Sequence, residues 1–469
     1  MDNAILLDFG STFTKATVVD LKRKEIVFTT KAPSTVSEDA KRGLDACYKA
    51  IREEIGSRAF DRGIKLATSS AAGGLRMAVI GLTPTLSIVA GKNAAFGAGA
   101  KIIKICSGLV TDEDIGELEL LDVEIILVCG GYENGNVSMV LQNVEKLASS
   151  ACRVPIIYAG NTKVQKQVRM IFKCAGKECF IVDNIIPDVD IIQSKPAEEL
   201  IRSIFLNRIA GTKGMDKVRA AIDRLVMPTP AAVLAAGELL SLGTERQKGL
   251  GALAIVDIGG ATTDIHSYCY PLGARGAKMV GTPEPYAKRT VEGDLGMRES
   301  SGLVMEAIGY QQAMEDLDLA ENEIKLSVDK RLSRIKFLPA DEKSLDEQEK
   351  ELKIDQWIAR YAARTAMRRR AGYIECVQSK LCPYLQHGKN LEEVGVLIGT
   401  GGPIINSAHP SEILKEAFST ERDERLRSLL PKNGVQMVDN DYILYAAGIL
   451  REIDEEAALT IMKKSLREV

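Results

Sequence analysis

The stretch Asp257–Asp264, with the sequence DIGGATTD, is the sequence feature that most constrains the fold. The apolar run 252–256 precedes it and Ile265–Tyr268 follows it, which predicts a tight turn between two β-strands. Two adjacent glycines let the backbone turn sharply and approach a ligand closely. Successive N–H groups in such a turn can bind an anion, and the flanking carboxylates can hold a metal ion directly or through its waters. A plain hairpin with a Gly-Gly turn is the alternative interpretation of this stretch alone.

A second stretch with the same order of residue types lies near the N-terminus. The apolar run 4–7 leads into Asp8–Lys15, DFGSTFTK, and a further apolar run follows. Two strand–turn–strand units, one opening each half of the chain, predict a duplicated domain. Their two phosphate-binding turns are expected to face each other across a cleft, and the pair is much more specific than either turn alone.

A second comparison between the halves involves strands that end in Gly-Gly. The apolar run 123–128 leads to Cys129–Asn136, and Val396–Ile398 leads to Gly399–Asn406. Each lies a similar distance beyond the phosphate turn of its half, so we expect the two to be equivalent. In the second half, these glycines are expected to let a nucleoside lie against the backbone.

The length of 469 residues exceeds one ordinary domain and predicts two lobes, at residues 1–245 and 246–469. Residues at about 300–375 are charged and helix-favouring, which predicts a helical subdomain in the second lobe. A formal net charge of −3 and 5% aromatic residues argue against a nucleic-acid partner. The chain starts in a predicted strand and has no bilayer-spanning apolar run, so we expect a cytoplasmic protein without a membrane partner.

Cysteine and histidine offer no convincing metal or disulfide pattern. The nine cysteines include no C-x-x-C pair, and the three histidines are dispersed. An odd cysteine count without an export signal argues against a disulfide framework, and the histidines are too few for a convincing zinc site.

Two further stretches have both a nucleotide-related and a structural interpretation. The strand 64–68 ends in hydroxyl residues and a Gly pair before Arg76, which either reaches a phosphate or is structural. The basic run 363–372 either offers Arg368 to adenine or phosphates or forms an ordinary solvated face.

Two helices rich in Ala and Gly, at 229–237 and 441–450, are interpreted as a crossing pair between the lobes or as core helices.

In this order, the motifs resemble the actin/sugar-kinase/heat-shock ATPase superfamily. The resemblance implies an α/β fold of duplicated RNase H-like (actin-like ATPase) domains flanking a nucleotide cleft, with a helical insertion in the second lobe. The stretches that carry it are two phosphate motifs (Asp8–Lys15, Asp257–Asp264), two connecting helices (Pro230–Gly237, Tyr445–Gly448), the adenosine motif (Val396–Asn406), and Gly293–Gly296, which is similar to a stretch of DnaK-type chaperones.

A narrower resemblance is to the GlmL/MutL family, the MutL that is associated with glutamate mutase rather than with mismatch repair. It rests on Ala67–Met77, Val154–Asn161 and Arg289–Arg298, and it spans essentially the whole chain. The family is encoded with adenosylcobalamin-dependent carbon-skeleton mutases and aminomutases. The resemblance implies an ATPase that acts as a chaperone-like reactivating factor, releasing damaged cobalamin from such an enzyme, with or without a small second reactivase subunit.

The motifs and the resemblance together predict the site residues. Asp8 and Asp257 are expected to position Mg²⁺ through its waters, and Asp264, or a water that it holds, to act as the base. Backbone amides of both turns are expected to hold the β- and γ-phosphates of ATP, so that ATP and ADP select different lobe angles. The predicted nucleotide contacts are Gly10, Ser11, Thr12, Lys15, Gly259, Gly260, Ala261, Thr262, Thr263, Gly293, Gly296, Arg368, Gly399, Thr400, Gly401 and Gly402.

Three alternatives belong to other classes. A small-molecule kinase would use the same turns but needs a substrate pocket with a catalytic Asp. An ATP-dependent activator of the 2-hydroxyacyl-CoA dehydratase type would share the Asp-x-Gly-Ser-Thr-x-x-Lys start, although that family holds an iron–sulfur cluster by cysteines, which are scattered in this chain. A filament-forming actin relative is the structural alternative.

Overall fold

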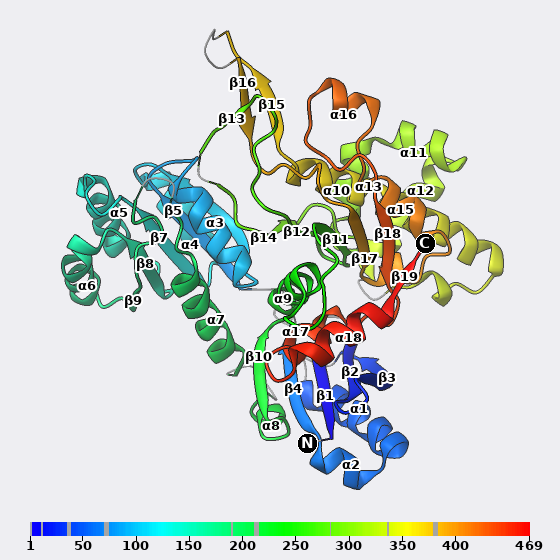
Figure 1. Cartoon of the computed structure of the whole chain (residues 1–469). Coiled ribbons are helices and arrows are strands. Elements are labelled where there is room, and N and C mark those ends of the chain that lie inside the picture. Colours follow the sequence, from blue (N-terminus) through cyan, green and yellow to red (C-terminus); the bar gives the residue numbers. More distant parts are fainter. Residues whose placement is uncertain are drawn as a thin grey trace. The chain divides into compact units, whose positions relative to one another are not determined.

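The computed structural model of the chain describes residues 2–10, 13–34, 39–69, 75–188, 191–210, 215–281, 283–334, 337–378 and 383–469 (Figure 1). Contacts divide the chain into two compact units. The first contains residues 1–233 and 281–283, and the second contains residues 234–280 and 284–469. In the described ranges, no helix combines the length and the apolar character needed to cross a membrane.

The first unit contains a five-stranded mixed sheet with the order β10-β4-β1-β2-β3. The central strand β1 pairs antiparallel with β2 and parallel with β4, and it is buried from Ala4 to Phe9 because helices such as α1 pack against this sheet. The outer pairs are β2 with β3, antiparallel, and β4 with β10, parallel. The elements are β1 (Asn3–Phe9), β2 (Phe13–Asp20), β3 (Glu25–Pro33), α1 (Ala40–Ile55), β4 (Ile64–Ser69) and β10 (Arg224–Pro228).

The second unit repeats this arrangement. Its six-stranded sheet has the order β14-β12-β11-β17-β18-β19, and the pairs β11–β12 and β12–β14 are antiparallel whereas β11–β17 and β17–β18 are parallel. When the first sheet is read from its other edge, as β3-β2-β1-β4-β10, the strands β14-β12-β11-β17-β18 match it in order and in orientation. This match confirms the predicted fold of duplicated RNase H-like domains. The strands are β11 (Leu253–Ile258), β12 (Thr263–Tyr268), β14 (Ala287–Glu292), β17 (Val396–Thr400), β18 (Val435–Asp439) and β19 (Leu466–Glu468).

A separate parallel sheet is inserted between β4 and β10, and no feature of the sequence predicts it as a unit. Its order β6-β5-β7-β8-β9 corresponds to 2-1-3-4-5 along the chain, the flavodoxin-like order of doubly wound sheets. Its central strands are uninterrupted apolar runs because both faces of such a sheet are covered by helices. The elements are β5 (Arg76–Gly81), α3 (Ser87–Gly97), β6 (Lys101–Ser107), α4 (Asp112–Leu120), β7 (Ile125–Gly130), α5 (Ser138–Ser149), β8 (Ile156–Gly160), α6 (Gln165–Cys174), β9 (Cys179–Ile181) and α7 (Lys195–Ala210).

The expected equivalence of Cys129–Asn136 and Gly399–Asn406 is wrong. Cys129 lies in β7 of the inserted sheet, whereas Gly399 lies in β17, the fourth strand of the second core sheet. The counterpart of β17 in the first core sheet is β4, which ends at Ser69. An apolar run that ends in Gly-Gly identifies a strand but does not reveal which strands it pairs with, and this explains the error.

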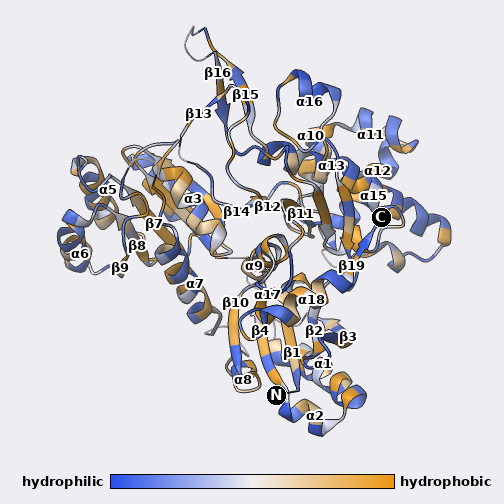
Figure 2. Cartoon of the chain, viewed as in Figure 1, coloured by the Kyte–Doolittle hydropathy of each residue, from blue (hydrophilic) through white to orange (hydrophobic). Residues whose placement is uncertain are grey.

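The helical insertion expected in the second half lies between β14 and β17. Figure 2 shows α11 mostly in the hydrophilic colour and α3 of the first unit mostly in the hydrophobic colour, as expected for a surface helix and a buried one. The insertion contains α10 (Ser301–Ile308), α11 (Tyr310–Leu317), α12 (Glu321–Ser333) and α13 (Leu345–Arg370), and a small sheet of β13 (Lys278–Met279), β15 (Tyr373–Cys376) and β16 (Tyr384–His387) lies beside it in the same unit.

A helix follows the fifth strand of each core sheet. α9 (Thr229–Leu242) follows β10, and α17 (Leu444–Leu450) follows β18, ahead of α18 (Glu455–Ser465). The Tyr268 hydroxyl donates to Leu234 O at 3.0 Å, and its ring lies 2.3 Å from the place of a Cβ at Gly237. Only glycine therefore fits at this point of α9. The crossing of the two helices between lobes stays a prediction.

Candidate functional site

The two predicted turns share one backbone hydrogen bond. Gly10 N–H donates to Phe13 O at 3.0 Å, and Gly259 N–H donates to Thr262 O at 2.9 Å. Each turn follows an aspartate two residues earlier, Asp8 or Asp257, near the end of the first strand of its core sheet. The duplication therefore extends from the order of the strands to individual hydrogen bonds.

Asp8 is buried at the end of β1. The residue is 2% exposed, and Oδ1 accepts a hydrogen bond of 2.7 Å from the Thr229 hydroxyl at the start of α9. Lys15, which pairs with Asp8 in register, places Nζ 3.8 Å from Oδ2. Burial raises the pKa of Asp8, and the lysine and the hydroxyl only partly oppose it. Thr229 was missed as a site residue, although a hydroxyl residue before a helix-starting proline was a usable signal.

Side chains hold the first turn in place. The Ser34 hydroxyl donates to Gly10 O at 2.7 Å, and the Ser69 hydroxyl donates to Phe9 O at 3.3 Å. A Cβ at Gly10 would lie 2.7 Å from Phe13 O, so the turn favours glycine there. The predicted contacts Ser11 and Thr12, and residues 70–74, lie outside the described residues.

Backbone N–H groups that follow β14 donate hydrogen bonds to carbonyl oxygens of the second turn. Met297 N–H donates to Gly259 O at 3.0 Å, and Arg298 N–H donates to Gly260 O at 2.8 Å. The Thr263 hydroxyl donates to Leu295 O at 2.7 Å. The two backbone bonds use carbonyl groups of the turn rather than its amides. Among the described residues, the N–H groups of residues 260–262 donate to no acceptor. An anion could therefore bind to them.

The stretch Gly293–Gly296 packs against this turn. A Cβ at Gly296 would lie 2.4 Å from the Ala261 carbonyl oxygen, so the close approach requires glycine. Asp294 accepts two hydrogen bonds from Arg369, at 2.7 and 2.8 Å. The role that the structure gives to Gly296 is support of the turn, and direct contact of Gly293 or Gly296 with a nucleotide stays a prediction.

Asp264, opposite Asp257 in the β11–β12 ladder, is part of a buried ion pair. Its Oδ2 accepts from Arg289 Nε at 3.0 Å and from Arg289 Nη2 at 2.7 Å, and Oδ1 has no partner within the described chain. His266, two residues further along β12, is fully buried with neither ring nitrogen hydrogen-bonded there, and burial lowers its pKa. A role of Asp264 as a base, through its free oxygen, stays a prediction.

The predicted adenosine motif begins beside Asp257, because Asp257 and Thr400 are register partners in the β11–β17 pair. Gly401 has φ +88°, and a Cβ there would lie 2.2 Å from Ile258 O and 2.9 Å from Asp257 Oδ1. Glycine is therefore needed both for the backbone conformation and for this close approach. Gly402 is exposed and begins the short helix α14 (Gly402–Ile405).

Two residues of the same motif have packing partners instead. A Cβ at Gly399 would lie 2.6 Å from Ile404 Cγ2, and the buried Thr400 hydroxyl donates to Asp439 Oδ2 at 3.2 Å. Their glycine and threonine identities are explained without a ligand, and nucleotide contacts of Gly399 and Thr400 stay predictions.

The two predicted arginines both have carboxylate partners. Arg76 starts β5, where Nη2 lies 2.8 Å from Asp122 and 3.6 Å from Glu124, which supports its structural interpretation. Arg368 on α13 donates to both oxygens of Asp423, at 2.8 and 2.6 Å. These bonds occupy the edge of the Arg368 guanidinium and leave its faces for stacking, so its predicted contact with adenine is compatible with the pair.

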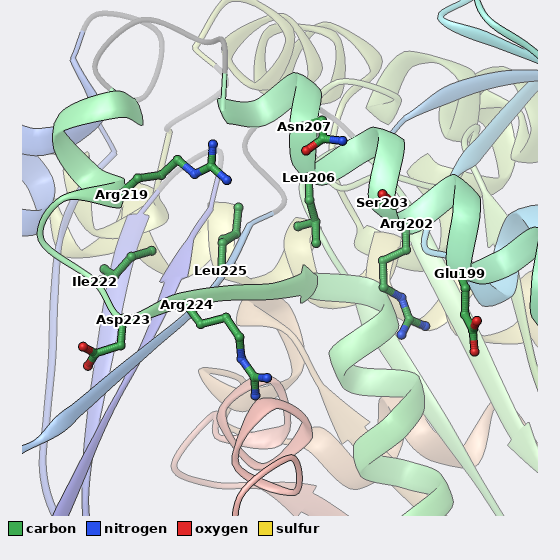
Figure 3. A pocket seen from close by; sticks show the side chains of 10 residues that line it. All are labelled: Glu199, Arg202, Ser203, Leu206, Asn207, Arg219, Ile222, Asp223, Arg224 and Leu225. Carbon is green, nitrogen blue, oxygen red and sulfur yellow. The ribbon is translucent and has the colours of Figure 1, made fainter. Parts of the chain in front are cut away.

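A groove in the first unit lies between α7 and β10, apart from the strand-end turns (Figure 3). It encloses about 430 Å³ and is lined by Arg202, Arg219 and Arg224 among other residues. Figure 3 shows Arg219 reaching over the groove toward Leu206, whereas Arg224 leaves β10 on the side opposite Leu225. The guanidinium groups do not converge, so the groove does not form a single anion site.

The part of the chain that the structure describes holds no cluster of metal-ligating side chains. In the described ranges, no group of three or more His, Cys, Asp or Glu side chains is placed to hold an ion, and every described cysteine is a free thiol.

Comparison with known proteins identifies the family. A family model described as MutL protein matches residues 4–466. The chain belongs to the MutL protein family. Protein MutL of Clostridium tetanomorphum is 39% identical over 471 residues, which cover 100% of both chains. The resemblance to the glutamate-mutase-associated GlmL/MutL family is thereby confirmed.

Two solved structures match this MutL-family chain at low sequence identity. Gluconate kinase from Lactobacillus acidophilus is 9% identical, over 100% of this chain and 92% of the kinase, with a TM-score of 0.32. A flavodoxin from Streptococcus pneumonia TIGR4 is 13% identical, over 27% of this chain and 94% of the flavodoxin, with a TM-score of 0.20. The fold assignment of the MutL-family chain therefore rests on its strand order.

Proposed function

We propose that this MutL-family chain is an ATP-dependent, chaperone-like reactivating factor for an adenosylcobalamin-dependent mutase or aminomutase. The observation that carries the proposal is the pair of matching turns, each closed by the same hydrogen bond and each preceded by a strand-end aspartate. Membership of the MutL family supports the class of partner, because the family is the one associated with glutamate mutase.

The donor set fits Mg²⁺ with a nucleotide better than a bare metal ion. Mg²⁺ usually keeps several waters and binds through one or two carboxylates together with substrate phosphates. Asp8 and Asp257 would hold it in this way, and the free amides of residues 260–262 suit phosphate oxygens. The space beside Asp257 is kept open by Gly401, where any side chain would meet the carboxylate. When bound, the ion would neutralise charge on the transferred phosphoryl group.

Phosphoryl transfer needs mostly positioning and charge neutralisation, which the two turns of this chain would supply. Lys15 would offset negative charge beside Asp8, and Asp264 would orient or deprotonate the attacking water through Oδ1. If both turns act on one nucleotide, as the superfamily resemblance implies, ATP and ADP would favour different arrangements of the two halves. A mutase bound to one arrangement would be opened by the cycle and would release its damaged cobalamin.

Reactivation of an inhibited mutase tests the proposal. The protein and Mg²⁺–ATP are mixed with candidate mutases blocked by cyanocobalamin, and activity is measured after addition of fresh adenosylcobalamin. We expect recovery with at least one mutase, and none when Asp257→Asn or a non-hydrolysable ATP analogue is used. If no candidate recovers while the protein hydrolyses ATP, the reactivation role is wrong and the ATPase role stands.

A further inference from the structure

Arg298 contacts the second turn directly through its backbone. Its N–H donates to Gly260 O at 2.8 Å, and its Cγ lies 3.7 Å from the place of a Cβ at Gly260. The neighbouring Glu299 N–H donates to the same carbonyl at 3.1 Å. A ligand that binds the amides of this turn therefore acts on peptide groups whose carbonyls Arg298 helps to hold.

The side chain of Arg298 runs in the other direction, to the helical insertion. Nη1 and Nη2 donate to the two oxygens of Asp355 on α13, at 2.9 and 2.8 Å, and Nε donates to Phe337 O at 2.9 Å. The residue is 7% exposed, so this parallel two-bond contact lies in a low-dielectric environment, where such pairs are strong and directional.

Asp355 is shared with a second buried arginine. Arg331 of α12 donates to Asp355 Oδ1 from Nε at 3.0 Å and from Nη2 at 2.8 Å, and it also pairs with Glu351 of α13. Arg331 and Glu351 are both fully buried. Because removal of one member leaves uncompensated buried charge, the network holds α12, α13 and Arg298 as one unit.

We infer that Arg298 is a positioning residue that couples occupancy of the second turn to the helical insertion. Its amide and its guanidinium belong to one residue, so a displacement of Gly260 O moves the contact with Asp355. The inference rests on the proposed nucleotide site, and it adds a route by which the state of that site reaches α11–α13.

The chain carries its own reporter for this route. Trp357, the single tryptophan, lies on α13 close to Asp355, and its Nε1 donates to Asp316 of α11 at 2.9 Å. A shift of α13 relative to α11 changes the surroundings of this indole. Tryptophan fluorescence of the full chain therefore reports the insertion without a label.

The test titrates Mg²⁺–ADP into the full-length protein while calorimetry measures binding and fluorescence follows Trp357. The wild type is expected to show a fluorescence change that saturates together with the heat of binding. Arg298→Lys keeps the backbone amide and the charge but loses the paired contact, so it should still bind ADP with most of the fluorescence change gone. Arg334→Lys, an exposed arginine at the end of α12, is the matched control and should behave as the wild type.

The outcomes separate the coupling from the nucleotide site itself. Binding heat without a Trp357 change in the wild type, or an undiminished change in Arg298→Lys, overturns the coupling and leaves the nucleotide site intact. Absence of any binding heat overturns the proposed site and the coupling with it. If Arg298→Lys does not fold, hydrogen exchange of wild-type α13 with and without ADP decides, because coupling requires slower exchange near Asp355 when ADP is bound.

Discussion

The first and second strand–turn–strand units share the turn hydrogen bond and the strand-end aspartate, and they differ in the side chains around these features. Lys15 is the register partner of the strand-end aspartate in the first strand–turn–strand unit, and Asp264 is its register partner in the second. In the second, Arg289 compensates the charge of the additional carboxylate. The first turn is held by the Ser34 hydroxyl and the second by backbone amides that follow β14. Duplication has preserved this turn hydrogen bond and the strand-end aspartate, while the charges and supports beside them have diverged.

The largest expected effect comes from removing the cation that is specific to the second unit. Arg289→Leu leaves Asp264 buried without its partner, which should destabilise the second unit by about 3–5 kcal/mol. Thermal unfolding followed by Trp357 fluorescence measures this. Lys15→Met is the matched change in the first unit and should leave the Trp357 transition where it is. Equal shifts for both variants would show that the two environments are not independent.

Asp8→Asn separates stability from activity in the first unit. Because burial raises the pKa of Asp8 above 3.8, the folded unit binds a proton more tightly than the unfolded chain, and the stabilisation from that proton is lost as pH rises through the raised pKa. The variant should therefore be more stable than the wild type at neutral pH, with the advantage shrinking as pH falls toward 3.8. ATP hydrolysis should fall by about 10–100-fold, as expected for loss of a group that orients a metal's ligands.

Hydrogen exchange of β1 amides across a pH series measures the stability part of this prediction, and phosphate release measures the activity part. Asp257→Asn is the counterpart and should lower hydrolysis similarly. A less stable Asp8→Asn protein at neutral pH would contradict the reasoning from burial.

Alanine at the two matching turn glycines compares the tightness of the turns. A Cβ at Gly10 would lie 2.7 Å from Phe13 O, whereas a Cβ at Gly259 would lie 3.2 Å from Thr262 O. Gly10→Ala should cost about 1–3 kcal/mol, the range for forced overpacking, and Gly259→Ala should cost less. Calorimetric ADP affinity and hydrogen exchange of the altered turn measure both, and the reverse order would show that the turns relax differently from one another.

The smallest expected effect concerns the matching threonines of the second strands. Thr263 donates to Leu295 O, whereas the buried Thr14 hydroxyl has no hydrogen-bond partner within the described chain. Thr263→Val should cost about 1 kcal/mol, the net value of a typical hydrogen bond, and Thr14→Val should be neutral or stabilising. Unfolding midpoints of the two variants test this, and a destabilised Thr14→Val protein would reveal an undetected partner of that hydroxyl.

The turns were predictable because their signals are local. Glycine pairs, flanking aspartates and apolar runs are adjacent in sequence, so Asp8–Lys15 and Asp257–Asp264 identified the strand–turn–strand units and the fold class. The inserted parallel sheet was not predictable as a unit, since the runs that form β5 to β9 look like any other buried strands until their pairing is known.

The supports of the site were also hidden from sequence reasoning. Thr229 meets Asp8 across 221 positions of the chain, and Arg298 meets Asp355 across 57. Neither contact follows from a spacing or a motif, because it depends on how separate elements pack. The basic run predicts a role for Arg368, but it does not indicate the partner Asp423, which lies on α16 (Glu421–Arg425).

The position of the inserted sheet has a consequence for synthesis of the chain. The Thr68 hydroxyl of β4 donates to Met227 O of β10, which lies 159 residues downstream. During synthesis, β4 can therefore pair with β10 only after these residues have been made. At a ribosomal rate of about 5–20 residues per second, that delay is roughly 8–30 seconds. During this time β4 has an open edge that can pair wrongly, whereas β5 to β9 have all their sheet partners once β9 ends at Ile181, ahead of β10. The nascent protein should therefore complete its inserted domain before the sheet that carries Asp8.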